Sequence, residues 1–387
     1  MNSILLVKKA TVVALMAGLT ISRLASADIN VGVVLSLTGP AASLGIPAGN
    51  TVKLWPKTIA GQKINLTVLS DNSDTSETAK QVSKLITEEK VDVIVGPSLT
   101  PNSLTAVEIA ARHSTPIIAL GGGNIIVEPM DDKKKWAFKM PAPEILSVNK
   151  VVSHMLAHKV KNVAVVAVTT SYGEGFLKAF QSVASAKGIN IVATERYAAQ
   201  DLNTTPQALR ITNSNADAVF IMSFGTPGAT PQLELAQRGY KGLVYQTHGV
   251  ANADYLRVGG QAVEGTFMAV APVLVAEQLP ANNVTKKSGI DYVKKYEAAN
   301  GVNTRSLFGS TAWTALVWLE KAVPLALKKA KPGTPEFKAA LRDALEGMRE
   351  VVTPEGVFNM TTSNHNGLDD RAQVLIQVKN GTWKYVE

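Results

Sequence analysis

The chain has 387 residues, a length that favours two domains, because a single hydrophobic core rarely grows beyond about 250–300 residues. Hydrophobic residues make up 46% of the sequence and charged residues 18%, a balance typical of globular proteins rather than disordered or fibrous ones. The formal net charge is +8, but the longest basic run is Lys133 to Lys135, so no nucleic-acid-binding surface is indicated. The absence of cysteine excludes disulfides, thiolate zinc sites and thiol nucleophiles.

Residues 1–27 have the pattern of a secretory signal peptide. Lys8 and Lys9 precede the apolar run ATVVALMAGLTI, and the small residues Ala25-Ser26-Ala27 stand where signal peptidase cleaves. The apolar run is too short to cross a bilayer, and no later segment has the length and apolarity of a membrane span. We therefore predict export to the periplasm, with cleavage after Ala27 and a mature protein of formal charge +5 after the loss of three basic residues.

From Asp28 onward, short apolar strands alternate with helical patterns. The apolar runs are INVGVVLSL, INLTVLS, VDVIVG and TPIIAL. Between them lie the helical stretch SETAKQVSKLITEEK and a helix expected from Pro101 to His113. Apolar strands separated by helices of this length predict a parallel sheet covered on both faces, and therefore an α/β fold.

The alternation then restarts in a second half. The runs NVAVVAV, INIVATERY, ADAVFIM and GLVYQT are separated by helical patterns at 147–158, 173–186, 206–213 and 231–238. The tail adds a long helix from Ser306, a helix from Pro335 to Gly347 and a β-hairpin closed by Asn380-Gly381. Because this tail needs partners in both halves, we predict two Rossmann-like lobes joined by several hinge crossovers. The first comprises 28–142 and 272–350, and the second 143–271 and 351–387.

The loops that follow the predicted strands are the candidate binding site, since ligands of open parallel sheets bind at the carboxyl ends of the strands. They are rich in glycine and hydroxyl residues: SLTGPAASLG, GPSLTPNS, GGGN, TTSYGEG, SFGTPG and QTHGVAN. In GPSLTPNS, Thr100 or Asn102 can cap the following helix, whose first N–H groups would attract an anion such as a carboxylate. The alternative is a plain helix cap without a ligand.

Catalytic patterns are not found in the sequence. His154 and His158 stand four residues apart on a predicted helix, but no acidic residues accompany them in a metal-binding pattern, and we interpret the pair as helix surface. The chain has no Gly-x-Ser-x-Gly nucleophile motif, no Gly-x-x-x-x-Gly-Lys-Ser/Thr phosphate loop and no dinucleotide fingerprint. We therefore expect a binding protein without a metal or cofactor, and not an enzyme.

Four segments in order resemble the periplasmic branched-chain amino-acid-binding proteins, the type I solute-binding components of ABC importers. They are INVGVVLSLTGPAASLG, VDVIVGPSLTPNSLTAVEIAARHSTPIIAL, SYGEGFLKAF and QTHGVAN. The resemblance covers essentially the whole mature chain. It implies a two-lobed fold that closes on a small molecule by a hinge motion, a membrane permease as partner, and a monomeric receptor.

The resemblance also implies a set of binding residues. The ligand carboxylate would be held by hydroxyl and backbone N–H groups at Ser98, Thr100, Asn102, Gly122 and Asn124. An aromatic ring closing over the ligand would be Tyr172, and the walls of the side-chain pocket would include Leu44 and Phe308, with Trp313 further along the same helix.

One position departs from the family pattern. Where the amino-acid binders carry an acid that pairs with the ligand ammonium, this chain has His248. An ammonium buried without a partner costs on the order of several kcal/mol, so we predict a hydrophobic or aromatic carboxylic acid, or a keto or hydroxy acid, rather than an amino acid. The alternatives are that Glu174 meets the ammonium in a branched-chain amino-acid binder, that the ligand is an amide or urea, or that the chain is an exported enzyme.

Overall fold

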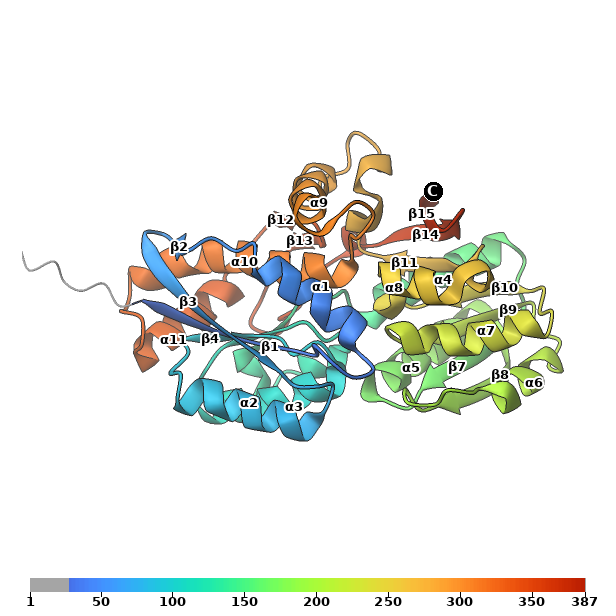
Figure 1. Ribbon diagram of the computed structural model, residues 1–387, viewed down its shortest axis with the longest axis horizontal. Helices are drawn as coiled ribbons and strands as arrows, with labels where there is room; N and C mark the ends of the chain where they lie inside the picture. The colour runs from blue at the N-terminus through green and yellow to red at the C-terminus, as the bar shows by residue number, and fades with distance from the viewer. Residues whose placement is uncertain (1–27, 387) are drawn as a thin grey trace, which may run out of the picture.

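The computed structural model describes residues 28–386 and contains two α/β lobes side by side along the long axis of the molecule (Figure 1). The predicted signal peptide lies outside the described residues. No helix in residues 28–386 is long and apolar enough to cross a membrane. The α/β fold class predicted from the alternating apolar runs is confirmed.

The first lobe has a six-stranded sheet in the order β2-β3-β1-β4-β5-β6. Its strands are β1 (Ile29–Leu35), β2 (Thr58–Ile59), β3 (Gln62–Ser70), β4 (Val93–Val95), β5 (Ile117–Ala119) and β6 (Ala137–Lys139). All neighbours are parallel except β2 with β3. The helices of this lobe include α1 (Ala42–Val52), α2 (Thr75–Thr87), α3 (Thr100–Arg112), α10 (Leu307–Leu327) and α11 (Pro335–Glu346).

The second lobe has a seven-stranded sheet in the order β15-β14-β11-β10-β9-β7-β8. Its strands are β7 (Asn162–Val168), β8 (Asn190–Tyr197), β9 (Ala218–Met222), β10 (Leu243–Gln246), β11 (Phe267–Val270), β14 (Val374–Lys379) and β15 (Thr382–Val386). Its helices are α4 (Glu144–Ala157), α5 (Ser171–Lys187), α6 (Thr205–Thr212), α7 (Ala229–Gln237) and α8 (Ala253–Gly259). The predicted turn between β14 and β15 is present, with positive φ angles of 54° at Asn380 and 66° at Gly381.

Burial explains why the apolar runs form central strands. β4 and β9 are buried along their whole length, so both faces of each strand are covered by helices. An outer helix such as α2 buries one apolar face, with Val82, Leu85 and Ile86 directed into the core. Its first turn is fixed by Asp74, whose carboxylate accepts hydrogen bonds from the N–H groups of Ser76 and Glu77.

The two sheets share one topology, which sets the place of the site. The order β3-β1-β4-β5-β6 in the first lobe matches β8-β7-β9-β10-β11 in the second. In each sheet the second long strand is added on one side of the first, and the following strands are added on its other side. The switch point therefore lies between β1 and β4 in the first sheet and between β7 and β9 in the second. Loops that leave neighbouring strands at such a switch point diverge and leave a crevice for a ligand.

The chain passes between the two sheets three times, and the segments beside two of these crossovers pack on different lobes. The segment with the 3₁₀ helix η6 (Pro272–Gln278) and α9 (Lys286–Asn300) packs in one cluster with β11 and β14 of the second sheet. The hairpin of β12 (Val351–Thr353) and β13 (Gly356–Phe358) packs instead in the core of the first lobe, where Phe358 meets Trp318 with ring centroids 4.7 Å apart. The hydrophobic pattern of a segment does not indicate which distant segment it packs against.

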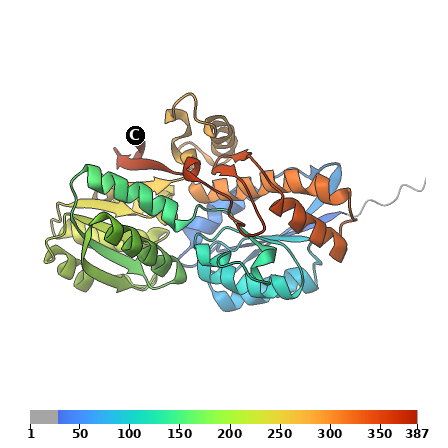
Figure 2. The ribbon, with the colours of Figure 1, turned by 180° about the vertical axis from the view of Figure 1, so that it is seen from behind.

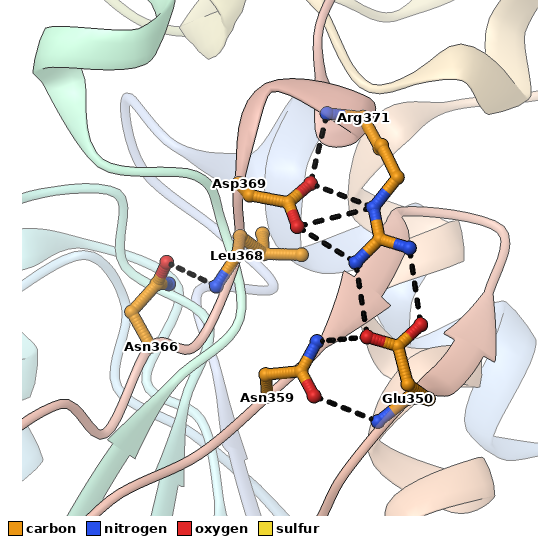
Figure 3. A network of polar contacts seen from close by, with 6 residues as sticks. All are labelled: Glu350, Asn359, Asn366, Leu368, Asp369 and Arg371. Carbon is orange, nitrogen blue, oxygen red and sulfur yellow. Dashed lines mark hydrogen bonds and ion pairs between the residues drawn. The ribbon is translucent and has the colours of Figure 1, made fainter.

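Polar contacts shown in Figure 3 stabilise the last crossover, which leads from the β12–β13 hairpin to β14. Arg371 pairs with Glu350 at 3.0 Å and with Asp369 at 2.7 Å, and Asn359 donates to Glu350 at 2.7 Å. Asn366 accepts from the N–H of Leu368. From behind, in Figure 2, the chain continues from here to the edge of the second sheet, where it ends.

Candidate functional site

A cavity lies between the lobes, at the carboxyl ends of the strands. Seven of the nine predicted site residues line it: Leu44, Ser98, Thr100, Gly122, Tyr172, His248 and Phe308. The remaining lining residues are Leu99, Leu120, Pro141, Phe224, Gly249, Leu307 and Thr311. Of these, Phe224 belongs to SFGTPG and Gly249 to QTHGVAN, so the strand-end rule had already indicated their loops.

Two hydroxyls at the start of α3 form the polar end of the cavity. The Ser98 hydroxyl accepts a hydrogen bond from the Ser36 N–H at 3.2 Å, and the Thr100 hydroxyl accepts one from the Gly123 N–H at 2.9 Å. Since each hydroxyl uses its oxygen as an acceptor, each keeps its own proton to donate. The residue before the helix, Leu99, provides no side-chain cap, and Pro101 has no N–H. The helix start therefore presents donors to the cavity and suits an anion.

Asn102 does not line this cavity, contrary to its predicted place. Its amide nitrogen donates to the buried carboxylate of Asp71 at 3.0 Å and to the hydroxyl of Thr78 at 2.8 Å. Asp71 also accepts from Ser36 at 2.8 Å. Asn102 therefore helps to satisfy a buried carboxylate beneath the loops, since α3 turns its third residue away from the cavity.

Asn124 does not line the cavity either. Its backbone N–H, the group predicted to hold a carboxylate, donates to both oxygens of Glu144, at 2.9 and 3.1 Å. Glu144 is buried in the first turn of α4. Of the two residues predicted in the GGGN loop, Gly122 is the one that lines the cavity. A Cβ there would lie 2.7 Å from Cε2 of Tyr172 and 3.0 Å from Nε2 of His248, so only glycine allows the lobes to approach this closely.

The second lobe contributes two buried polar atoms that lack partners. Among the described residues, Nε2 of His248 has no hydrogen-bond partner, and the hydroxyl of Tyr172 lies beside Thr247 and the backbone of Gly249 without a hydrogen bond of ordinary geometry. Burial, together with the nearby charge of Lys139, lowers the pKa of His248 to about 3, and burial raises the pKa of Tyr172 well above its ordinary value. Both side chains are therefore neutral at neutral pH. Unpaired buried polar atoms are costly, and a ligand can satisfy them.

The rest of the cavity wall is apolar. Leu44 after β1, Phe224 after β9 and Phe308 in the first turn of α10 are buried and face the same space. Trp313, which we expected to extend this wall, lies elsewhere. Its ring centroid lies 5.8 Å from that of Tyr292, and the ammonium of Lys295 lies 4.9 Å from it. Trp313 is five residues after Phe308, and at this position the side chain points toward α9 and not toward the cavity.

No acid lines the cavity, which bears on the possible ammonium. Glu174, the alternative partner, is half exposed and forms a bidentate ion pair with Arg196, with contacts of 2.6 and 3.1 Å. This pair holds the pKa of Glu174 below its ordinary value. The residues that line the cavity therefore carry no negative charge at neutral pH.

The His154–His158 pair is only partly at the surface. His154 shares a 2.8 Å hydrogen bond with the hydroxyl of Tyr245, and its burial lowers its pKa to about 4. Its ring lies against Phe267, with centroids 4.3 Å apart. Within residues 28–386 no cluster of three or more His, Asp or Glu side chains could hold a metal ion.

Residues 28–382 match the model of a family described as periplasmic binding protein. The chain belongs to this family. It is 21% identical over 332 residues to the Leu/Ile/Val-binding protein BraC3 of Rhizobium johnstonii, which spans 78% of this chain and 89% of that protein. The family consists of extracytoplasmic solute-binding receptors of ABC transporters, the role that the sequence had led us to expect.

Solved structures agree with this assignment. An extracellular ligand-binding receptor from Rhodopseudomonas palustris HaA2 is 39% identical, with a TM-score of 0.90 over 93% of this chain and 100% of that one. A solute-binding protein of an ABC transporter from Rhodopseudomonas palustris, in complex with benzoate, is 20% identical with a TM-score of 0.80 over 93% and 96% of the two chains. At that identity the likeness concerns the fold alone.

Sequence reasoning missed a pair of buried charges behind the site of this periplasmic binding protein. Lys139 ends β6 with no exposed surface, and its ammonium donates to the carbonyls of Gly122 at 3.1 Å and Pro141 at 2.6 Å. Glu144 lies on the other side of the same loop. The signal was a lysine within the apolar strand AFKM, since a charge in a fully buried strand needs a specific reason.

Proposed function

We propose that this periplasmic binding protein captures a small hydrophobic or aromatic monocarboxylate in the cleft between its lobes and delivers it to an ABC permease. The ligand carboxylate binds at the start of α3, and its apolar body occupies the space between Leu44, Phe224 and Phe308. We expect a monomeric receptor whose lobes close on the ligand by a hinge motion at the crossovers.

The observation that carries this proposal is the distribution of charge and donors around the cavity. Ser98 and Thr100 each have a proton to donate, the remaining walls are largely apolar, and no lining side chain is an acid. A carboxylate gains two charge-assisted hydrogen bonds there, whereas an ammonium would be buried without a counter-charge.

Neutral His248 and Tyr172 set the second half of the specificity. Their unpartnered atoms can bond a ring hydroxyl or a keto oxygen of the ligand, and neither demands a second charge. The benzoate complex of the Rhodopseudomonas palustris protein shows that a protein of this fold can hold an aromatic acid, which is compatible with the proposed class of ligand.

The competing candidate is a branched-chain amino acid, which the name of the Rhizobium johnstonii relative favours. The cavity argues against it, because Glu174 is engaged with Arg196 and Glu144 with the backbone of Asn124. An amide such as a urea derivative is a weaker candidate, since it would not use the positive end of α3.

Thermal-shift measurements followed by calorimetry test the proposal. The panel comprises benzoate, hydroxybenzoates, aryl keto acids, aliphatic carboxylates, leucine, phenylalanine and benzamide. We expect binding of at least one aromatic or hydrophobic monocarboxylate, with leucine more than about 100-fold weaker because of the unpaired ammonium. Binding of leucine as tight as that of any carboxylate would refute the proposed ligand class while leaving the receptor role intact.

A further inference from the structure

A continuous line of hydrogen bonds joins the buried ammonium of Lys139 to the cavity. The ammonium donates to the carbonyl of Gly122 at 3.1 Å, and the next N–H along the chain, that of Gly123, donates to the Thr100 hydroxyl at 2.9 Å. These two groups belong to the same peptide unit, in which C=O and N–H point in opposite directions. The Thr100 proton is then free for the ligand.

Lys139 is held in place from several sides. Its own N–H donates to the carbonyl of His365, and its carbonyl accepts from the Asn366 amide at 3.0 Å, which ties β6 to the last crossover. Its ammonium also donates to the carbonyls of Pro141 at 2.6 Å and Ala142 at 3.3 Å. In the described part of the chain no carboxylate lies within ion-pair distance of it.

We propose that Lys139 is a specificity-determining residue that never touches the ligand: its buried positive charge, passed through the Gly122–Gly123 peptide and the Thr100 hydroxyl, selects carboxylates over neutral and zwitterionic ligands. The inference rests on the proposed function, because it assigns a source to the carboxylate preference of the same cavity.

The physical reason is polarisation in a dry interior. An ammonium on the carbonyl oxygen makes the same peptide a stronger N–H donor, and a hydroxyl that accepts a stronger bond becomes a stronger donor itself. The charge also acts directly on the ligand. At about 8–10 Å and an effective dielectric constant of about 20, a unit charge changes the affinity for a monoanion about 10- to 30-fold.

Glu144 is the neighbouring charge that could oppose this effect, and it differs in its contacts. Its carboxylate accepts from the Asn124 N–H, outside the cavity, and has no hydrogen bond to the Gly122–Gly123 peptide. It therefore offers a matched control at the same loop, with a charge of opposite sign.

The test compares benzoate with benzamide, its neutral isostere, by calorimetry on the full mature chain. In Lys139→Met we expect the benzoate affinity to fall about 10- to 30-fold and the benzamide affinity to change less than about threefold. At about pH 6, well below the pKa of Lys139 of about 8, Glu144→Gln should not reproduce this selective loss; the low pH is needed because the Glu144 carboxylate raises the pKa of Lys139. Equal losses for both ligands in Lys139→Met, or a selective loss in Glu144→Gln, would mean that the loop and not the charge is responsible, and would overturn the inference.

A double-mutant cycle tests whether the charge of Lys139 acts on the ligand through the Gly122–Gly123 peptide and the Thr100 hydroxyl. If the charge acts through the hydroxyl, Lys139→Met should cost less benzoate affinity in a Thr100→Val background than in the wild type. Full additivity of the two losses would rule out the hydrogen-bonded path. If the wild-type protein binds no carboxylate in the panel, the proposed function and this inference are both refuted. If the wild type binds benzoate and Lys139→Met binds it with the same affinity, the inference alone is refuted.

The pH dependence of binding gives a test that leaves Lys139 in place. Burial lowers the pKa of Lys139 to about 8, so benzoate affinity should fall as the pH rises from 7 to 9.5 while benzamide affinity stays level. The charged or titratable groups around it are Glu144, Glu128, His248 and His365. Glu355, whose pKa burial raises to about 8, titrates in the same range and is removed with Glu355→Gln. A level benzoate profile in that variant would contradict the proposal.

Discussion

Replacing Thr100 by valine tests the anion site most directly, because it removes the hydroxyl and keeps the shape of the side chain. Two hydrogen bonds change. The hydroxyl can no longer donate to the ligand carboxylate, and the Gly123 N–H, which donates to it at 2.9 Å, loses its acceptor. The first loss affects binding, and the second affects the free energy of unfolding.

The two magnitudes can be worked out separately. A hydrogen bond to a charged partner contributes about 1.5–3 kcal/mol, so the dissociation constant for benzoate should rise about 10- to 150-fold. The stranded N–H of Gly123 is buried and should cost about 1–3 kcal/mol of stability in the unliganded protein. Thr100→Ser keeps the hydroxyl and should stay within a few-fold of wild type in affinity.

Calorimetry with benzoate measures the first effect, and urea unfolding of the unliganded protein measures the second. The valine variant must remain folded at the assay temperature, which circular dichroism checks. Wild-type affinity in a folded Thr100→Val variant would refute the carboxylate position, and an equal loss in Thr100→Ser would show that packing of the Thr100 methyl group, not its hydroxyl, matters.

Other substitutions test the remaining steps of the argument. His248→Glu places a carboxylate in the cavity, so benzoate affinity should fall about 100-fold and the leucine-to-benzoate affinity ratio should rise; a calorimetric ratio that does not move contradicts the ammonium argument. Gly122→Ala puts a methyl group 2.7 Å from Tyr172, so ligand affinity should fall and X-ray scattering should show a more open molecule; unchanged binding and shape would contradict the closed contact. Because the folded-state pKa of His248, about 3, lies below its ordinary 6.5, stability should be lost as the pH falls through that window, and His248→Gln should flatten this part of the urea-unfolding profile. Because the folded-state pKa of Glu355, about 8, lies above its ordinary 4.5, its burial costs stability increasingly as the pH rises between those values. Glu355→Gln should therefore add about 4 kcal/mol to the free energy of unfolding at pH 8 and little at pH 4, and an equal effect at both pH values would point to packing instead.

Local pattern was sufficient for most elements of the two sheets. The helix expected from Pro101 to His113 is α3, Thr100–Arg112, and the one expected at 173–186 is α5, Ser171–Lys187. These succeed because an apolar strand or an amphipathic helix buries the same face whatever lies opposite. The α9 helix and the β12–β13 hairpin were not anticipated, and both have partners outside their local sequence: Tyr292 of α9 shares a hydrogen bond with Thr51, 241 residues away, and Phe358 of β13 packs on Trp318.

The candidate site divides in the same way. Strand order and the strand-end rule bring Ser98, Thr100 and Tyr172 to one cavity, since the carboxyl ends of parallel strands meet at one edge of each sheet. The same rule cannot say which way a side chain turns. Asn102, two residues after Thr100, turns toward the buried carboxylate of Asp71, which the sequence places 31 residues away.

The sequence by itself determined the α/β lobes, the loops that surround the cavity and the histidine in place of an acid, because these follow from periodicity and from residue identity. Tertiary structure decided how charge is arranged around those loops. Only the folded chain engages Glu174 with Arg196 and sets Lys139 behind the Gly122 carbonyl, since both contacts join segments that no local pattern connects. Charge interactions in a dry interior depend on three-dimensional distance and burial, and a sequence specifies neither until it is folded.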